Sequence, residues 1–211
     1  MATAPHEDLG ERLLHRLLFF TDAVFAIVLT LLVLELRPPL HDPRGLVALA
    51  GPFAALVLSF SVISIFWVAH MATTRLLETF DWPTAIANLV FLFCICLIPT
   101  VSVWVGENLI TGEGWAVYCS VLIATSIANA VLVMIQSRDG GRLMRGGVTG
   151  RQRIYRLGRA LSPGLAFAIG LVGLAAGTVH IAQLCWVLIP LFVRLCEVVL
   201  KPKATVSAKA A

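Results

Sequence analysis

The stretch RLLFFTDAVFAIVLTLLVLEL, residues 16–36, decides the fold class of this chain. At ~1.5 Å per residue, a helix of ~20 apolar residues spans the ~30 Å hydrocarbon core of a bilayer, and the run Leu17–Leu36 has that length. Asp22 interrupts the run. A carboxylate at the centre of a membrane helix costs about 2.5–3.5 kcal/mol on insertion scales. We therefore expect a membrane-spanning helix whose aspartate meets protein partners or water.

The composition places the whole chain in the membrane class. Hydrophobic residues make up 59% of the sequence, charged residues only 13%, and the mean hydropathy is +0.91, whereas soluble proteins carry about 25% charged residues. The net charge of +4 comes from basic residues at the ends of apolar segments, which suits membrane topology and not nucleic-acid binding. The five cysteines all fall in apolar segments, so we expect neither a disulfide framework nor a metal site.

Six apolar segments predict an all-α, polytopic membrane protein. The expected organisation is a cytoplasmic N-terminus over residues 1–16, a six-helix transmembrane domain over residues 17–200 and a cytoplasmic tail over residues 201–211. The first segment is too long for the apolar region of a signal peptide, so we expect it to remain as a helix. The last two segments should form a tight helical hairpin. The expected spans are Leu17–Leu36, Leu46–Met71, Thr84–Val105, Gly114–Gln136, Ser162–Val179 and His180–Leu200.

The distribution of Lys and Arg gives the expected orientation. With six spans, one side holds both termini and the second and fourth loops, and it carries nearly all the basic residues outside the spans. The opposite side carries only Arg37 and Arg44. The positive-inside rule therefore predicts that both termini lie in the cytoplasm.

The fourth loop is basic throughout, with seven arginines from Arg138 to Arg159. It is either a topology determinant that touches anionic lipid headgroups or a regulatory site for a specific lipid or ligand. Ser162 and Pro163 are expected to be the N-cap and first residue of the helix that follows.

The first segment carries two distinct faces. At ~100° per residue, Phe20, Ile27, Leu31 and Leu34 fall within about 40–60° of one another, and Asp22 points about 140° away from Ile27. The apolar stripe is either lipid-facing, helix-packing or pore-lining. The sequence contains no TVGYG-type filter and no HExxH, GxSxG or P-loop pattern.

Asp22 needs partners, and the second segment offers two. Trp67 and His70 are spaced i,i+3 and can face one neighbour. Together with Arg16 they would supply hydrogen-bond donors to the carboxylate. Such a network is either a polar staple between the first two helices, a titrating or gating switch, or a catalytic pair.

These residues also carry a resemblance to a known family. The run Arg16–Asp22 is similar to the R-x-x-x-F-S-D signature of the transmembrane protein 175 potassium channel family, with Thr21 in place of serine. Residues 66–70, FWVAH, resemble the W-x-x-H of its second helix, and Asn88 followed by FLFCICLIPT resembles its third helix. The first half of the chain carries most of this resemblance.

The resemblance implies a potassium-permeable channel, not an enzyme, with no cofactor besides the permeant K⁺. The length and six-helix count suit the family's prokaryotic form, so the resemblance also implies a prokaryotic plasma membrane. It implies a homotetramer with four copies of the first helix around a central axis. Ile27, Leu31 and Leu34 would then form the narrowest part of the pore. Arg16, Thr21, Asp22, Trp67 and His70 would be packing determinants behind it.

Three other functions stay open from the residues. The first is a proton-coupled transporter or proton-leak pathway that uses Asp22 and His70, although transporters generally contain inverted repeats and none is evident. The second is an intramembrane enzyme. The third is a non-conducting structural protein.

Overall fold

The computed structural model describes residues 9–37, 45–107 and 111–201. These residues are almost entirely helical, which confirms the predicted all-α class. The helices are α1 (Leu9–Leu34), η1 (Gly45–Leu49), α2 (Ala50–Thr74), α3 (Trp82–Glu107), α4 (Gly112–Gln136), η2 (Arg138–Gly140), α5 (Gly150–Ala175), α6 (Val179–Leu184), η3 (Cys185–Val187) and α7 (Leu188–Leu200). The outer parts of the predicted tails, residues 1–8 and 202–211, lie outside the described residues.

Six helical segments of the described chain are long and apolar enough to cross a membrane, as the sequence predicts. Five are single helices, counting η1 with α2, and the sixth runs from Val179 to Leu200 through α6, η3 and α7. The chain is therefore an integral membrane protein. The predicted hairpin is present, since α5 ends at Ala175 and α6 begins at Val179.

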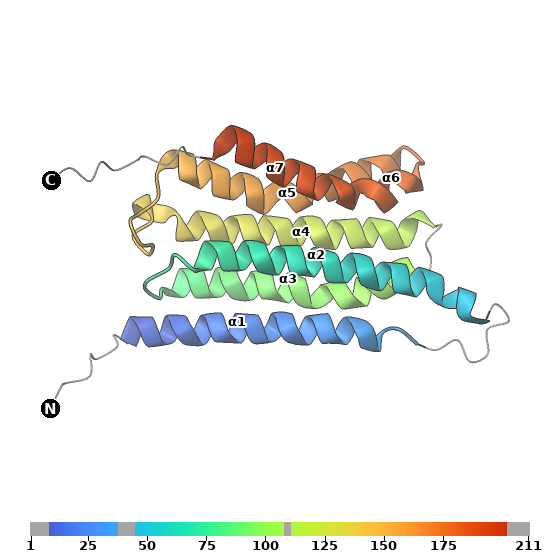
Figure 1. Cartoon of the computed structure of the whole chain (residues 1–211), viewed down its shortest axis with the longest axis horizontal. Helices are drawn as coiled ribbons and strands as arrows, with labels where there is room; N and C mark the ends of the chain where they lie inside the picture. The colour runs from blue at the N-terminus through green and yellow to red at the C-terminus, as the bar shows by residue number, and fades with distance from the viewer. Residues whose placement is uncertain (1–8, 38–44, 108–110, 202–211) are drawn as a thin grey trace, which may run out of the picture.

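The long helices lie side by side in one bundle (Figure 1). α1 forms one edge and packs on α2 and α3, whereas α4 packs between α3 and α5. α6 and α7 pack on α5 at the opposite edge. α1 begins and α7 ends at the same end of the bundle, as an even number of spans requires. We call this the basic end, because the arginine-rich α4–α5 connection lies there.

Aromatic side chains fill the centre of the bundle and join its helices. Phe91 of α3 lies with its ring centroid 6.0 Å from both Phe25 of α1 and Phe66 of α2. Tyr118 of α4 makes an edge-to-face contact with Phe167 of α5 at 6.0 Å. These five side chains are almost completely buried, so the core is continuous from α1 to α5.

Two helices begin earlier than the sequence predicts. α1 starts at Leu9 and not Leu17, and α5 starts at Gly150 and not Ser162. A capping box begins α5, in which Thr149 and Gln152 exchange hydrogen bonds between side chain and backbone. The expectation that Ser162 and Pro163 open the helix is therefore wrong, because both lie buried inside it.

The two connections at the basic end are paired with each other. Leu77 and Met144 form an isolated antiparallel bridge. On either side of it, Glu78 N–H donates to the Leu143 carbonyl at 2.9 Å and Arg145 N–H donates to the Leu76 carbonyl at 2.9 Å. These bonds hold the α2–α3 turn against the α4–α5 connection.

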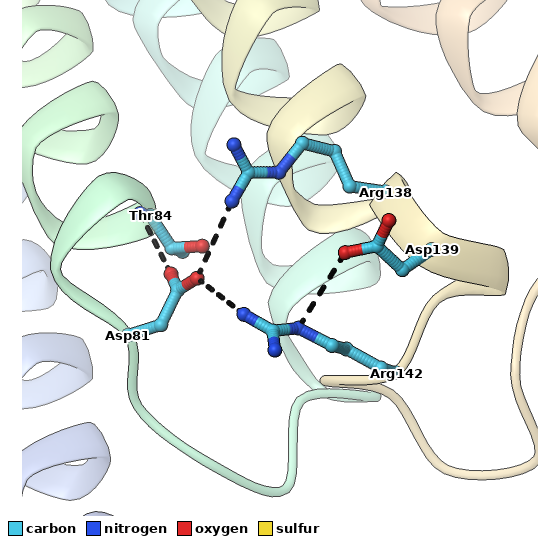
Figure 2. Close-up of polar contacts among 5 residues, drawn as sticks. All are labelled: Asp81, Thr84, Arg138, Asp139 and Arg142. Carbon is cyan, nitrogen blue, oxygen red and sulfur yellow. Dashed lines mark hydrogen bonds and ion pairs between the residues drawn. The ribbon is translucent and has the colours of Figure 1, made fainter.

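Asp81 adds an electrostatic link between the same two connections (Figure 2). Its Oδ1 accepts a hydrogen bond from the Thr84 backbone N–H at 2.8 Å, which satisfies a free donor in the first turn of α3. Its Oδ2 lies 3.9 Å from Arg138 Nη2 and 3.8 Å from Arg142 Nη2. One carboxylate therefore caps α3 and attracts the α4–α5 connection.

Two substitutions separate these roles of Asp81. Asp81→Ala removes both the cap and the ion pairs, and we expect it to lower the free energy of unfolding by about 1–2 kcal/mol. Asp81→Asn keeps an acceptor oxygen for the Thr84 N–H, so we expect it to retain most of that stability. Unfolding of the purified variants in detergent micelles measures both. Equal losses in the two variants would contradict the capping role.

Candidate functional site: the first helix and its supports

α1 contacts the rest of the bundle through one face only. Its buried side chains recur every three, four or seven residues, which keeps them on one side of the helix, and they are Leu14, Thr21, Phe25, Val28 and Leu32. This face meets α2 and α3. The other faces of α1 carry mostly apolar side chains that no part of the described chain covers.

The predicted stripe lies on the uncovered part of α1. Ile27 is 58% exposed, Leu31 42% and Leu34 73%. Phe20, one helical repeat earlier, is 50% exposed. Large apolar side chains uncovered at this level require either lipid or another protein surface around them. The single chain therefore leaves the stripe free to face lipid, a second copy or a pore.

A chain of buried hydrogen bonds connects the covered face of α1 to α2 and α3. Asn88 Nδ2 of α3 donates to Thr21 Oγ1 of α1 at 2.8 Å, and Thr21 donates in turn to the Leu17 carbonyl at 2.8 Å. Asn88 Oδ1 lies 2.8 Å from His70 Nε2 of α2. An amide oxygen only accepts, so Nε2 carries the proton and donates. All three side chains are at most 3% exposed.

His70 is fixed by stacking as well as by this hydrogen bond. Its ring lies parallel to that of Phe91, with the centroids 5.6 Å apart and the planes inclined by 7°. The Phe25 ring of α1 lies 6.1 Å from it. His70 is therefore a contact point for three helices.

Asp22 takes part in a separate contact. Trp67 Nε1 of α2 donates to Asp22 Oδ1 at 3.0 Å. Asp22 is exposed in the single chain, and Trp67 is only partly buried. Within the single chain Asp22 therefore meets one protein partner, Trp67, and stays exposed, because α1 lies at the edge of the bundle and Asp22 comes one residue after the covered Thr21.

The structure thus divides the predicted polar residues into two groups. Thr21 and His70 meet through Asn88, and Asp22 meets Trp67. Arg16 is exposed, and within the described part of the chain no hydrogen bond or ion pair joins it to Asp22, Trp67 or His70. Asp22 and His70 likewise share no hydrogen bond there.

Sequence reasoning missed a second buried polar cluster. Ser59 of α2 donates to Ser102 Oγ of α3 at 2.8 Å and lies 2.9 Å from the Tyr118 hydroxyl of α4. Single serines in apolar runs give no signal of such pairing. This cluster joins α2, α3 and α4 in the same way that Asn88 joins α1, α2 and α3.

Known proteins with similar sequences belong to one group of ion channels by name. The family described as "Endosomal/lysosomal potassium channel TMEM175" matches residues 16–99, which run from α1 to the proline inside α3. A Streptomyces collinus protein named as a potassium channel is 33% identical over 57% of this chain and 63% of its own length. One from a Chryseobacterium species, also named as a potassium channel, is 31% identical over 60% of this chain and 66% of its own length.

Two further relatives extend this comparison. The rat protein named "Endosomal/lysosomal proton channel TMEM175" is 26% identical over 60% of this chain and 27% of its own length. The crystal structure of a TMEM175 homologue from Chamaesiphon minutus, titled a lysosomal potassium-selective channel homologue, superposes with a TM-score of 0.72 at 22% identity. That superposition covers 87% of this chain and 98% of the other, so the two share a fold.

The chain is thus an all-helical membrane protein that shares its fold with the Chamaesiphon minutus homologue. Its resemblance to the TMEM175 family is confirmed, and the matched region is the first half of the chain, as the motifs predict. The matched segments cover less than two thirds of the bacterial relatives' own length.

Two substitutions compare the supports of α1. Asn88→Leu leaves the buried Nε2–H of His70 without an acceptor, so we expect a loss of about 1–3 kcal/mol in the free energy of unfolding. Trp67→Phe removes one partly exposed hydrogen bond and should cost about 1 kcal/mol or less. Denaturant unfolding in detergent micelles measures the loss in the free energy of unfolding for each variant. A larger loss in Trp67→Phe would show that Asp22 and not Asn88 is the main polar support.

Proposed function

We propose that this chain forms a potassium-permeable cation channel, a homotetramer with one α1 from each copy around a central pore. The observation that carries the proposal is the uncovered apolar stripe Ile27, Leu31 and Leu34, at i, i+4 and i+7 of α1. The stripe lies within the segment that matches the TMEM175 family. Two bacterial relatives of this chain are named potassium channels. Beyond the permeant K⁺ the proposal needs no cofactor and no enzymatic step.

Three rings of apolar side chains would then constrict the pore. Residues 27 to 34 span about 10 Å along a helix, so the rings stack within a short length. Apolar side chains offer an ion no ligand to replace its hydration shell. A narrow ring therefore blocks conduction by excluding water, and its diameter decides whether a hydrated ion passes.

The polar residues behind the stripe would set its orientation. Thr21 and His70, joined by Asn88, fix the rotation of α1 on its own bundle. Asp22 and Trp67 lie at the surface of the chain, where a neighbouring copy would cover them, and the exposed Arg16 would meet a neighbouring copy as well. All five predicted residues then act as packing determinants and not as ion ligands.

We further propose that both termini lie in the cytoplasm of a prokaryotic cell and that the basic end faces it. Basic residues gather at this end, and cytoplasmic loops carry the excess of Lys and Arg. The outer surface of the Arg138–Arg159 region would then contact anionic lipid headgroups.

The pore assignment is tested by truncating one ring. Leu31→Ala should widen the constriction, and we expect purified protein in liposomes to admit more Na⁺ relative to K⁺ and to leak faster. Val90→Ala is the matched control, because Val90 is a 53% exposed aliphatic residue on α3 outside the stripe. The measurement is the flux of each cation driven by a voltage gradient.

Two outcomes of that assay would contradict the proposal. Identical K⁺ to Na⁺ flux ratios in Leu31→Ala, Val90→Ala and the unchanged chain would assign the stripe to lipid. A monomeric mass for the conducting protein would exclude the tetramer.

A second candidate is a proton-leak or proton-coupled pathway that uses Asp22 and His70. The buried hydrogen bonds of His70 favour a part for this residue, although they do not include Asp22, and the rat relative is named a proton channel. The same liposomes distinguish the candidates. Proton flux that persists without K⁺ and falls in His70→Gln supports the second, whereas K⁺ flux unchanged by His70→Gln supports the first.

A further inference from the structure

A cavity of about 890 Å³ lies at the basic end, away from the stripe on α1. The last turns of α2 and the turn after it form one wall, and the 145–149 segment with the first turns of α5 forms another. Asn129 of α4 and the end of α7 complete the lining. The paired connections fix this arrangement, because Arg145 N–H donates to the Leu76 carbonyl and both residues line the cavity.

The cavity wall is strongly positive. Six basic side chains line it, against the single carboxylate of Glu197, and they are Arg75, Arg145, Arg151, Arg156, Arg159 and Lys201. Glu197 lies 3.4 Å from Arg194, which is not part of the lining. Like charges around one concavity repel one another and concentrate the field, so the arrangement favours an anion inside.

Arg156 gives the cavity a fixed charged group. It is only 9% exposed, although arginine is rarely buried without a carboxylate partner. Its Nη2 donates to the Thr73 carbonyl at 2.9 Å, and its Nη1 contacts the Met144 sulfur. Both partners are uncharged, and within the described residues no carboxylate forms an ion pair with this guanidinium. A guanidinium has five N–H donors, more than these two contacts use.

Two other features of the lining suit a phosphate-bearing molecule. Thr149, Arg151 and Gln152 belong to the N-terminus of α5, where the helix dipole favours phosphate. The capping box already pairs the backbone N–H groups of Thr149 and Gln152, so the dipole and the Arg151 side chain carry this attraction. Asn129 is 3% exposed, and its Oδ1 has no hydrogen-bond partner among the described residues. A hydroxyl group on the ligand would supply the missing donor.

We propose that this cavity binds a phosphate-bearing anion, which is either the headgroup of an anionic phospholipid or a soluble phosphate. Arginine forms paired hydrogen bonds with phosphate oxygens, which suits the guanidinium-rich lining. The cavity is distinct from the outer surface of the basic region and does not depend on the channel proposal.

Calorimetric titration of the full chain in detergent micelles tests the site. The probes are pyrophosphate, dihexanoyl phosphatidylglycerol and, as a zwitterionic control, dihexanoyl phosphatidylcholine. Arg151→Gln removes a charge from the lining and should weaken binding of the anionic probe about fivefold. Arg153→Gln is the matched control, because Arg153 is exposed on the same helix but does not line the cavity. It should leave binding nearly unchanged.

Glu197→Gln should change the affinity for the anionic probe in the opposite direction. It removes the one carboxylate of the lining and should tighten binding of the anionic probe about fivefold. Phosphatidylglycerol that binds more tightly than pyrophosphate, with this pattern of variants, identifies a lipid site. Pyrophosphate binding without phosphatidylglycerol binding, with the same pattern, identifies a soluble ligand. Absence of binding by both anions, or equal weakening by Arg151→Gln and Arg153→Gln, would overturn the proposal.

Discussion

The hydrogen-bonded series from Thr21 through Asn88 to His70 is the constraint on which the rest of the arrangement depends. In a hydrocarbon environment, a buried polar group without a partner costs several kcal/mol. Rotating α1 by one residue would turn Thr21 about 100° away from Asn88 and break the series. Its present geometry therefore selects one rotation of α1. Phe25 and Leu32 are covered in that rotation, while Ile27, Leu31 and Leu34 are left on the surface.

The length of the apolar runs predicts the six spans well, because a bilayer imposes one length on every helix that crosses it. The sequence also predicts that Ile27, Leu31 and Leu34 lie on a different side of α1 from the covered face. The angle of a side chain around a helix follows from its residue number alone. The sequence places the start of α5 too late, at Ser162 instead of Gly150, because Arg151, Arg153 and Arg156 give its first turns the composition of a loop. A capping box and the contact of Arg156 with Thr73 make those turns helical.

The partners of the candidate site could not be predicted in the same way. Asn88 pairs with Thr21 across 67 residues, and no spacing rule connects positions on different helices. The cost of a carboxylate in lipid predicts that Asp22 has a partner, but it does not select Trp67, which is 45 residues away on α2. The last turn of α2 also connects the two regions of interest, since the His70 side chain supports α1 and the Thr73 carbonyl holds Arg156.

In the proposed channel, the uncovered stripe of α1 meets the same stripe of three other copies around an ion path. Leu31→Cys tests this most directly, because four thiolates around a narrow axis would bind Cd²⁺, a soft ion that prefers sulfur ligands. We predict that Cd²⁺ blocks the current of Leu31→Cys channels in planar bilayers and does not block Val90→Cys channels or the unchanged chain, which carries the native cysteines as a control. If Cd²⁺ leaves the Leu31→Cys current as unchanged as the Val90→Cys current, Leu31 does not line the pore.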